Sequence, residues 1–309
     1  MNRNNGSNIL SSTQSASLPS LFLLLISCLL LGCEKTIKFN LDSSAPKLVV
    51  DAQIENGQPP VVILTNSLDY FSSINATIVN NLFVHDAAIT LTDGIRTHRL
   101  REYAVPVAPG LFFYFYGTDS SNLSTAITGT FNTTYTLRIA SGGTEYLATT
   151  TIPTLAKRPD SMWWKPAPFA TDSNQVTVWV HSSDPPGLGN YVRYYTRRNS
   201  EPFLPGENSV FDDQVIDGTS YSVPVEPGID RNNRVPRDST LFRKGDTVTI
   251  KLTNIDRNTF RFWSTWEFAQ QSIGNPFAQP GVVIGNISNG ALGAFCGYAA
   301  DYRSLVIPR

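Results

Sequence analysis

The sequence predicts an all-β protein with two β-sandwich-like domains and one helix in the second domain. Thr, Val, Tyr and Phe are frequent from residue 33 onward, and these residue types favour strands. Short runs of alternating apolar and polar residues are bounded by Gly, Pro, Asn and Asp, and the chain has 20 Pro and 21 Gly to supply turns. An apolar period of 3.6 residues, which would indicate helices, is almost absent.

Residues 1–32 have the pattern of a signal peptide. A short apolar run over 18–31 follows a start whose only charge is Arg3. The run is too short to cross a bilayer, which takes about 20 residues. It ends in Leu30-Leu31-Gly32-Cys33, which resembles the bacterial lipobox, whose cysteine receives a diacylglycerol and becomes the new N-terminus. We therefore expect lipid on Cys33, with acyl chains such as palmitate and membrane lipid as the partner. A plain secretory signal and a transmembrane anchor are the alternatives.

Charge and cysteine content restrict the partners. The formal net charge is −1, without a basic stripe or an acidic tail, so nucleic acid is not an expected partner. Cys28 lies in the signal and Cys33 is used for lipid, which leaves Cys296 alone and excludes an intrachain disulfide. Because Cys296 lies among small and aromatic residues, we expect a buried, inert thiol.

Residues 33–46 are expected to form a tether, and residues 47–153 the first domain. Asn56-Gly57 and Asp93-Gly94 are dipeptides that close hairpins. Seven short strands over about 110 residues fit a sandwich of immunoglobulin-like or transthyretin-like type. The predicted strands are Lys47–Ile54, Val61–Asn66, Ala88–Thr92, His98–Tyr103, Leu111–Tyr116, Thr134–Ala140 and Tyr146–Ile152.

A proline-rich junction over 153–168 separates a second β-rich domain, residues 154–309. Val176, Val178 and Val180 lie on one face of a predicted strand and Trp179 on the other, which predicts a central strand covered on both faces. The predicted strands of this domain are Gln175–His181, Tyr191–Arg198, Phe211–Ile216, Ser220–Val225 and Thr247–Leu252.

One helix is predicted near residues 256–273. Asp256 is a suitable N-cap, and Ile255 and Phe260 have the spacing of a hydrophobic staple. Gly274 is expected to end the helix. The apolar stripe that we expect to pack on a sheet, rather than bind a ligand, consists of Phe262, Trp266, Ala269 and Ile273, with Trp263 beside it.

No catalytic residue, metal site or cofactor is predicted. His85, His98 and His181 lack the spacing of a zinc site, and no nucleophile elbow, P-loop or dinucleotide fingerprint occurs. His181-Ser182-Ser183-Asp184 holds the residue types of a catalytic triad, but neighbours on a strand point in alternating directions, so this segment predicts a strand entering a turn. Loop carboxylates without the register of a calcium loop are expected to be solvated: Asp212, Asp213, Asp217, Asp230, Asp238 and Asp246.

Trp163 and Trp164 are the candidates for stacking on a ligand. As neighbours on a strand they would face opposite sides, so one could form an exposed platform for a sugar, while packing between domains is the competing interpretation. The tyrosine-rich run from Tyr191 to Tyr195 is a further candidate for glycan contact.

Ordered blocks over residues 33–309 resemble a family of Bacteroidota lipoproteins, the domain of unknown function 4249. The resemblance implies an outer-membrane lipoprotein with β-domains, often encoded beside TonB-dependent receptors, and supplies no catalytic residues. Directly after Cys33 only Glu34 is acidic, so both the periplasmic and the cell-surface side of the outer membrane stay open as locations. The blocks are Cys33-Glu34-Lys35, residues 46–67, Asp184-Pro185-Pro186-Gly187 with Gly189-Asn190-Tyr191, Gly245-Asp246-Thr247-Val248 with Ile255-Asp256, Asn275-Pro276-Phe277 and residues 286–293.

Three short segments resemble the O-glycosylation motif of these bacteria, an Asp followed by Ser or Thr and then by an apolar residue or Thr. Their acceptors are Ser161, Ser239 and Thr247. Thr247 begins a predicted strand and Ser161 borders the two tryptophans, so we expect Ser239 to be the most occupied. In the loop over 286–293, Gly290 and Gly293 are expected at positive φ.

These observations together predict a non-enzymatic outer-membrane lipoprotein that is an accessory or partner of a TonB-dependent transporter. A glycan-binding surface lipoprotein is the first alternative. A hydrolase whose site assembles from residues distant in sequence is the second.

Overall fold

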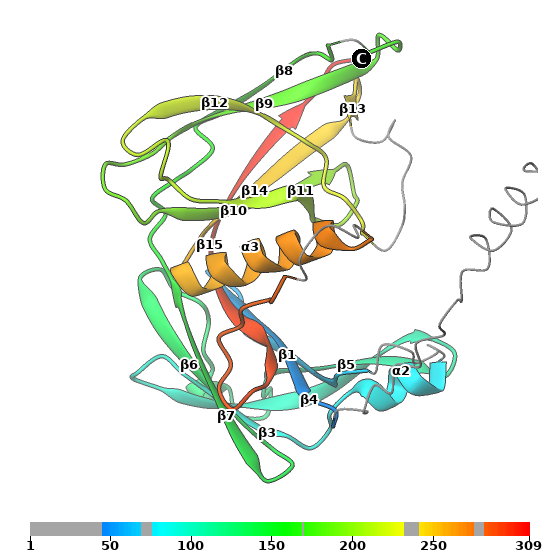
Figure 1. Cartoon of the computed structure of the whole chain (residues 1–309), viewed down its shortest axis with the longest axis vertical. Helices are drawn as coiled ribbons and strands as arrows, with labels where there is room; N and C mark the ends of the chain where they lie inside the picture. The colour runs from blue at the N-terminus through cyan, green and yellow to red at the C-terminus, as the bar shows by residue number, and fades with distance from the viewer. Residues whose placement is uncertain (1–44, 69–75, 169, 232–240, 275–280) are drawn as a thin grey trace, which may run out of the picture. The chain divides into compact units, whose positions relative to one another are not determined.

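The computed structural model describes residues 45–309, apart from 69–75, 169, 232–240 and 275–280 (Figure 1). Strands dominate these residues, and the predicted all-β class is confirmed. Cys33, Ser239 and the signal peptide lie outside the described residues.

The first seven strands follow the predicted runs, since each alternates apolar and polar residues. β2 and β3 have the predicted bounds, whereas β4 and β5 extend well beyond them as a long hairpin. A short helix, α2 (Ala76–Leu82), precedes β3, and a 3-10 turn, η1 (Leu123–Thr125), precedes β6. The strands are β1 (Leu48–Glu55), β2 (Val61–Asn66), β3 (Ala88–Thr92), β4 (Thr97–Ala108), β5 (Leu111–Thr118), β6 (Thr133–Ser141) and β7 (Thr144–Ile152).

In the described part of the second segment there are eight more strands and the main helix, α3 (Arg257–Ser272). The predicted boundary at residue 153 falls between β7 and β8. The strands are β8 (Ser161–Pro166), β9 (Gln175–Ser183), β10 (Tyr191–Arg198), β11 (Leu204–Phe211), β12 (Ser220–Val225), β13 (Phe242–Arg243), β14 (Thr247–Ile255) and β15 (Leu292–Val306).

Within the described residues the strands form two sheets. The long sheet has the order β11-β10-β14-β15-β1-β2-β5-β4-β3-β6-β7, and its pair β1–β15 is parallel. In the small sheet, β9 pairs with β8 on one side and with β12 and β13 on the other. β15 therefore joins strands from both segments of the chain, because it lies between β14 and β1.

The small sheet packs on the long sheet as the second layer of a sandwich. In Figure 1, β8, β9, β12 and β13 lie over β10 and β14. Val176, Val178 and Phe242 of the small sheet share a core with Val248 of β14 and with Ile307. A larger core gathers the inward residues of β1 to β7, where alternation places every second residue on one face.

The predicted helix is confirmed as α3, but its buried face differs from the predicted stripe. Asp256 caps the helix, and its side chain accepts a hydrogen bond from the Thr259 N–H. Thr259 and Glu267 are the buried positions, whereas Ile273 is 73% exposed at the end of the helix. Packing on a sheet is confirmed for Phe262 and Trp263, which contact the cluster of Ile255, Ala294, Cys296 and Tyr298. It is wrong for Ile273, and the buried Glu267 adds a polar contact in which it accepts from the Ser209 N–H. No helix of the described residues is long and apolar enough to span a membrane.

The strand predictions for the second segment need correction. The predicted strand Phe211–Ile216 is a turn, and β11 instead ends at Phe211. The chain turns there because the Ile216 N–H donates to the Asp213 carbonyl, while the Asp213 side chain accepts from the neighbouring loop at Gly189. β8, β13 and β15 lack predicted counterparts, although β15 is the longest strand described.

The loop before β15 has the predicted backbone. Gly290 has φ +74° and Gly293 has φ +91°, so both predictions of positive φ are confirmed. At Gly293 a Cβ would lie 2.0 Å from the Val50 carbonyl oxygen, which only glycine avoids. This close approach lets β15 begin directly beside β1.

Candidate functional site

The outward face of the small sheet is the candidate binding surface, here called the platform. It consists of the alternate residues of β8, β9 and β12 that point away from the core. Trp163 lies opposite Trp179, and Pro224 lies opposite Trp179 on the other side. Proline is tolerated in β12 because this strand pairs only with β9 and is an edge strand. The platform residues are Ser161, Trp163, Lys165, Thr177, Trp179, His181, Ser222 and Pro224.

Two indole rings form the centre of the platform. The ring centroids of Trp163 and Trp179 are 6.3 Å apart with an interplanar angle of 15°, an offset stack. Lys165 Nζ lies 4.6 Å from the ring centroid of Trp179, within the range of a cation–π contact. Both indoles are half-buried, so their remaining surface is open to solvent.

Hydrogen-bonding groups flank the indoles. On one side, His181 Nδ1 lies 3.0 Å from Ser222 Oγ, and Ser161 is exposed beside His181. On the other side are Lys165 and Thr177. An aromatic row between rows of donors and acceptors can stack on the apolar face of a ring and bond its hydroxyl groups, which is the arrangement that a sugar requires.

A cavity of about 500 Å³ adjoins the platform. β12 ends at Val225, opposite Val178, and β13 begins at Phe242, opposite Val176, so the partner of β9 is interrupted opposite Thr177. The lining is mostly apolar, with Lys165 and Glu226 as its charged members. A largely apolar pocket with few polar groups is typical of ligand sites.

The two candidate tryptophans have different places. Trp163 belongs to the platform, whereas Trp164 packs against the core that contains Val176 and Val178. Trp179 was predicted to lie on a covered face, and this was wrong because the second layer packs only against the valine face of β9. Its role in the platform was therefore missed, although its place among alternating valines is visible in the sequence.

The tyrosine-rich strand β10 does not join the platform. Tyr191 stacks on Phe260 of α3 with ring centroids 4.7 Å apart, and Tyr194 packs beside Ile250.

Of the modification candidates, Ser161 is exposed at the first position of β8, and Thr247 is half-buried at the first position of β14.

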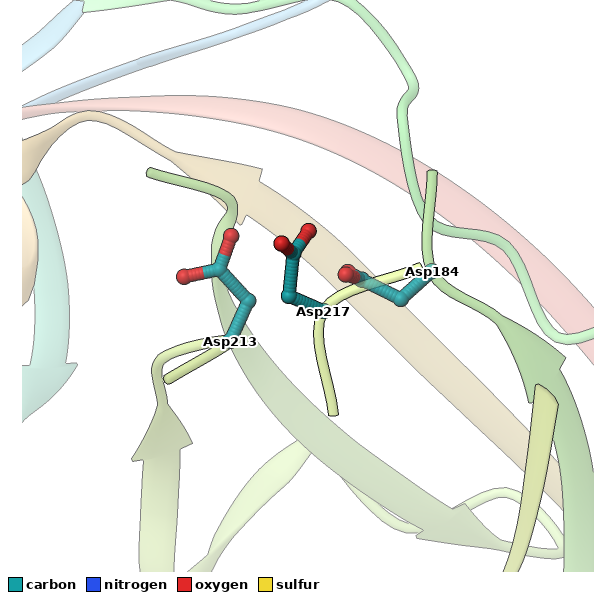
Figure 2. A group of neighbouring side chains, drawn as sticks. All are labelled: Asp184, Asp213 and Asp217. Carbon is teal, nitrogen blue, oxygen red and sulfur yellow. The ribbon is translucent and has the colours of Figure 1, made fainter. Parts of the chain in front are cut away.

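Three aspartates lie close together beside the C-terminal end of β9. Oxygen atoms of Asp184, Asp213 and Asp217 lie within 4.8 Å of one another (Figure 2). Asp184 directly follows β9, whereas Asp213 and Asp217 belong to the turn between β11 and β12. The expectation of solvated carboxylates was wrong for Asp213, which is 2% exposed. Its side chain accepts from the N–H groups of Gly189 and Asn190, each at 2.8 Å.

A buried ammonium supplies the counter-charge for this acidic cluster. Lys157 Nζ lies 2.6 Å from Asp184 Oδ1, and both side chains are 0% exposed. The contact is not aligned as a hydrogen bond, and neither atom has another such partner. A cation in this place would compete with Lys157, so the cluster joins loops rather than forming a metal site.

Each histidine of the described residues has its own local partner. His85 Nδ1 contacts the Glu102 carboxylate. His98 is buried, which lowers its pKa; it contacts Thr125 Oγ1 at 2.9 Å and accepts from the Asp119 N–H. Within the described part of the chain, His181 forms a hydrogen bond with Ser222 and none with a carboxylate. The segment that includes His181 is a strand entering a turn, as predicted.

Cys296 is buried, as predicted. It lies under α3 in a cluster with Ile255, Ala294 and Tyr298. Burial raises the pKa of its thiol to about 12, so the reactive thiolate is scarce at neutral pH.

Two comparisons with known proteins bear on the chain. The sequence pattern of a family described as a domain of unknown function, DUF4249, matches residues 34–304. A search of curated proteins found no significant match.

Proposed function

The chain belongs to the DUF4249 family, and we propose that this member is a non-enzymatic outer-membrane lipoprotein that binds its ligand on the platform. Lipid on Cys33 anchors it, and it serves as an accessory or partner of a TonB-dependent transporter. The lipobox-like Leu30-Leu31-Gly32-Cys33 supports the anchor. The family resemblance supports the transporter.

The stacked pair Trp163–Trp179 is the observation that supports a binding role best. The part of each indole that stays open to water costs free energy unless a ligand covers it, and these half-buried rings lie between hydrogen-bonding rows and beside a cavity. This arrangement also favours the second candidate function, that of a glycan-binding lipoprotein. The two functions are compatible, because an accessory protein can hold the glycan that its transporter imports.

Glycan binding is tested with the purified chain on a glycan array, followed by calorimetry. We expect Trp163→Ala and Trp179→Ala each to weaken binding about tenfold, the equivalent of one lost stacking contact. Phe131→Ala is the control, since Phe131 is 43% exposed and lies outside the platform. Unchanged affinity in both tryptophan variants would remove the platform as the glycan site.

The anchor and the transporter have separate tests. Intact mass should show acyl chains on the protein, and Cys33→Ala should release it from the membrane fraction. Affinity purification of the lipidated chain from outer membranes should recover a TonB-dependent transporter. A membrane-bound Cys33→Ala variant contradicts the anchor, and a purification without any such transporter contradicts the partnership.

Sugar on the three candidate acceptors can be read from the same native protein. We propose that Ser239 is the main O-glycosylation site. The intact mass should exceed that of the lipidated polypeptide and should fall in Ser239→Ala. Loss of sugar only in Thr247→Ala or Ser161→Ala would contradict this order.

A further inference from the structure

The β4–β5 hairpin ends in an apolar segment, residues 103–115, here called the hairpin tip. Its sequence, Tyr-Ala-Val-Pro-Val-Ala-Pro-Gly-Leu-Phe-Phe-Tyr-Phe, contains no charged residue. Beyond Leu100, β4 has no pairing with β3, and β5 pairs with β2 only at Tyr116. Both edges of the tip are therefore free of further pairing within the described residues.

The tip exposes large apolar side chains on both faces, and on one of them Val105 lies directly opposite Phe113. Val107 is 58% exposed, Val105 45%, Phe112 39% and Phe113 38%. Ring centroids of Phe113 and Phe115 are 6.4 Å apart. Single exposed apolar residues are normal on proteins, but a contiguous patch marks a surface that another apolar phase covers.

The residues along one face of β4 have the order that a membrane interface requires. Arg99, Arg101, Tyr103 and Val105 alternate onto the same face, from the base of the hairpin toward its end. Both arginines are exposed, and the Arg101 guanidinium carbon lies 6.0 Å from the ring centroid of Tyr103. Apolar residues suit the acyl region, tyrosine the boundary, and arginine the phosphates of the headgroups.

The chain also enters the fold beside the tip. At the start of β1, Val49 pairs with Thr65, which forms a bridge to Phe83, whose ring centroid lies 5.8 Å from that of Phe113. Adjacent strands are about 4.8 Å apart, so only two strand spacings and one ring contact separate β1 from the tip. Lys47 lies 14 residues after Cys33. This length keeps the fold within about 50 Å of a lipid on Cys33.

We propose that the hairpin tip inserts into the lipid interface of the membrane that holds Cys33. The proposal rests on the lipid anchor proposed above. The tip gives the fold a second membrane contact in addition to its acyl chains, on the side where the tether arrives.

The backbone of the tip suits a shallow position. Unpaired N–H and C=O groups oppose entry into hydrocarbon, so a two-stranded hairpin remains at the interface. Pro106 and Pro109 lack an N–H. The Asn80 side chain of α2 donates to the Gly110 carbonyl at 2.8 Å and accepts from the Phe112 N–H at 3.3 Å, which satisfies two more groups at the turn. Figure 1 shows α2 beside this hairpin.

A site-specific probe tests the proposal in the full lipidated chain. Val107→Cys is labelled with a polarity-sensitive fluorophore, and the protein is reconstituted in phosphatidylethanolamine–phosphatidylglycerol vesicles. Cys296 should not compete for the label, because it is buried and its pKa is raised. Ile95→Cys is the matched control, since Ile95 is 93% exposed just before β4, at the end away from the tip.

We expect the emission of the Val107→Cys probe to shift to shorter wavelength and to be quenched by brominated phospholipids. The Ile95→Cys probe should show neither effect. Adding Phe113→Glu to Val107→Cys should abolish the shift without changing the mass of the acyl chains, and thermal melting of each variant checks its fold.

The outcomes separate the tip from the anchor. Acylated protein without a shift at Val107→Cys overturns the tip contact and leaves the anchor in place. Equal shifts at both probes indicate general adsorption and also overturn it. A shift only after outer-membrane protein is added assigns the tip to a protein partner. If the mass shows no acyl chain, the anchor fails, and the Val107→Cys probe still decides the tip.

Discussion

The platform and the hairpin tip are two aromatic surfaces that reach solvent, the first built on the antiparallel strands β8, β9 and β12 and the second on β4 and β5. Behind the platform, the other face of β9 packs into a core through Val176 and Val178. The tip has apolar residues on both faces, such as Phe112 and Phe113, and both are exposed. The platform places Lys165 and His181 beside its indoles, whereas the tip has no charge.

This difference shows that exposed aromatic residues can serve opposite environments. Rings that alternate with hydrogen-bonding groups suit a polar ligand that has an apolar face. Rings with aliphatic neighbours on both sides of a hairpin suit a phase without hydrogen-bonding groups. The platform is also fixed by the buried structure behind it, whereas the tip is fixed by its own turn and by contacts from Asn80 and Phe83.

The largest effect is expected where the platform is attached to the fold. Asp184 directly follows β9, and its ion pair with Lys157 is fully buried. Lys157→Ala leaves this carboxylate unpaired and should lower the free energy of unfolding by about 3–5 kcal/mol. Urea unfolding of the variant and the unchanged protein measures this loss. Arg198→Ala is the control, because the exposed Arg198–Glu201 pair should contribute only about 0–1 kcal/mol. Equal losses in the two variants would contradict the contrast.

Three glycines should give a graded effect. A Cβ on Gly293 would meet the Val50 carbonyl oxygen at 2.0 Å, in addition to the strain of φ +91°. Gly293→Ala should therefore cost about 3 kcal/mol or more. Gly110→Ala, in the turn of the hairpin tip, carries strain at φ +73° but meets nothing within 4 Å, so about 1 kcal/mol is expected. Gly290→Ala, also open, should resemble Gly110→Ala. Melting temperatures that fall equally in all three variants would show that the close approach is not important.

Cys296 tests the opposite case, a side chain that is buried in the core rather than open to solvent. Because burial raises its pKa to about 12 from 9.0, a thiol reagent at pH 8 should label Cys296 only in denaturant. The contribution of this raised pKa to the free energy of unfolding is fully present below pH 9. This contribution should diminish as the pH rises from 9 toward 12, because the unfolded thiol ionises first. Mass spectrometry after labelling checks the first expectation, and rapid labelling of the native chain would refute burial.

The smallest effect is expected at the tip itself. Val107→Ser removes an apolar side chain that the fold leaves 58% exposed, so the free energy of unfolding should change by no more than about 0.5 kcal/mol. Association with vesicles should weaken nonetheless, as measured by flotation of the lipidated chain. A stability loss as large as that of Lys157→Ala would mean that the tip is part of the core.

Regular alternation made most strands predictable. Val61–Asn66, Ala88–Thr92, Tyr191–Arg198 and Ser220–Val225 were predicted with the bounds that the structure shows. Asp256, as N-cap, likewise identified α3. In these segments the local pattern and the packing agree.

Other features depend on contacts that are distant in sequence. β15 has small residues where strands usually have branched ones, because other chain segments approach it closely. A Cβ on Gly297, for example, would lie 2.7 Å from the Thr151 carbonyl oxygen. Alternation predicts that Trp163 and Trp164 face opposite ways, but only the position of the long sheet decides which of them is exposed.

The tip was hidden for another reason. Pro106 and Pro109 interrupt the strand pattern, so the predicted strand stopped at Tyr103, whereas β4 continues to Ala108. Proline is compatible with the hairpin there because the outer edge of β4 has no partner within the described residues. The absence of charge over residues 103–115 was the available signal.

The parallel pair β1–β15 also determines when the protein can fold. Val49 pairs with Leu292, so the centre of the long sheet needs residues from both ends of the described chain. Such non-local pairing makes folding slow, since a very long loop must close before the contact is gained. The sheet cannot be completed during synthesis, and a chain that ends before residue 292 would leave β1 and β14 with open edges. Open edges pair with other chains, so an interrupted product is expected to aggregate rather than to fold in part.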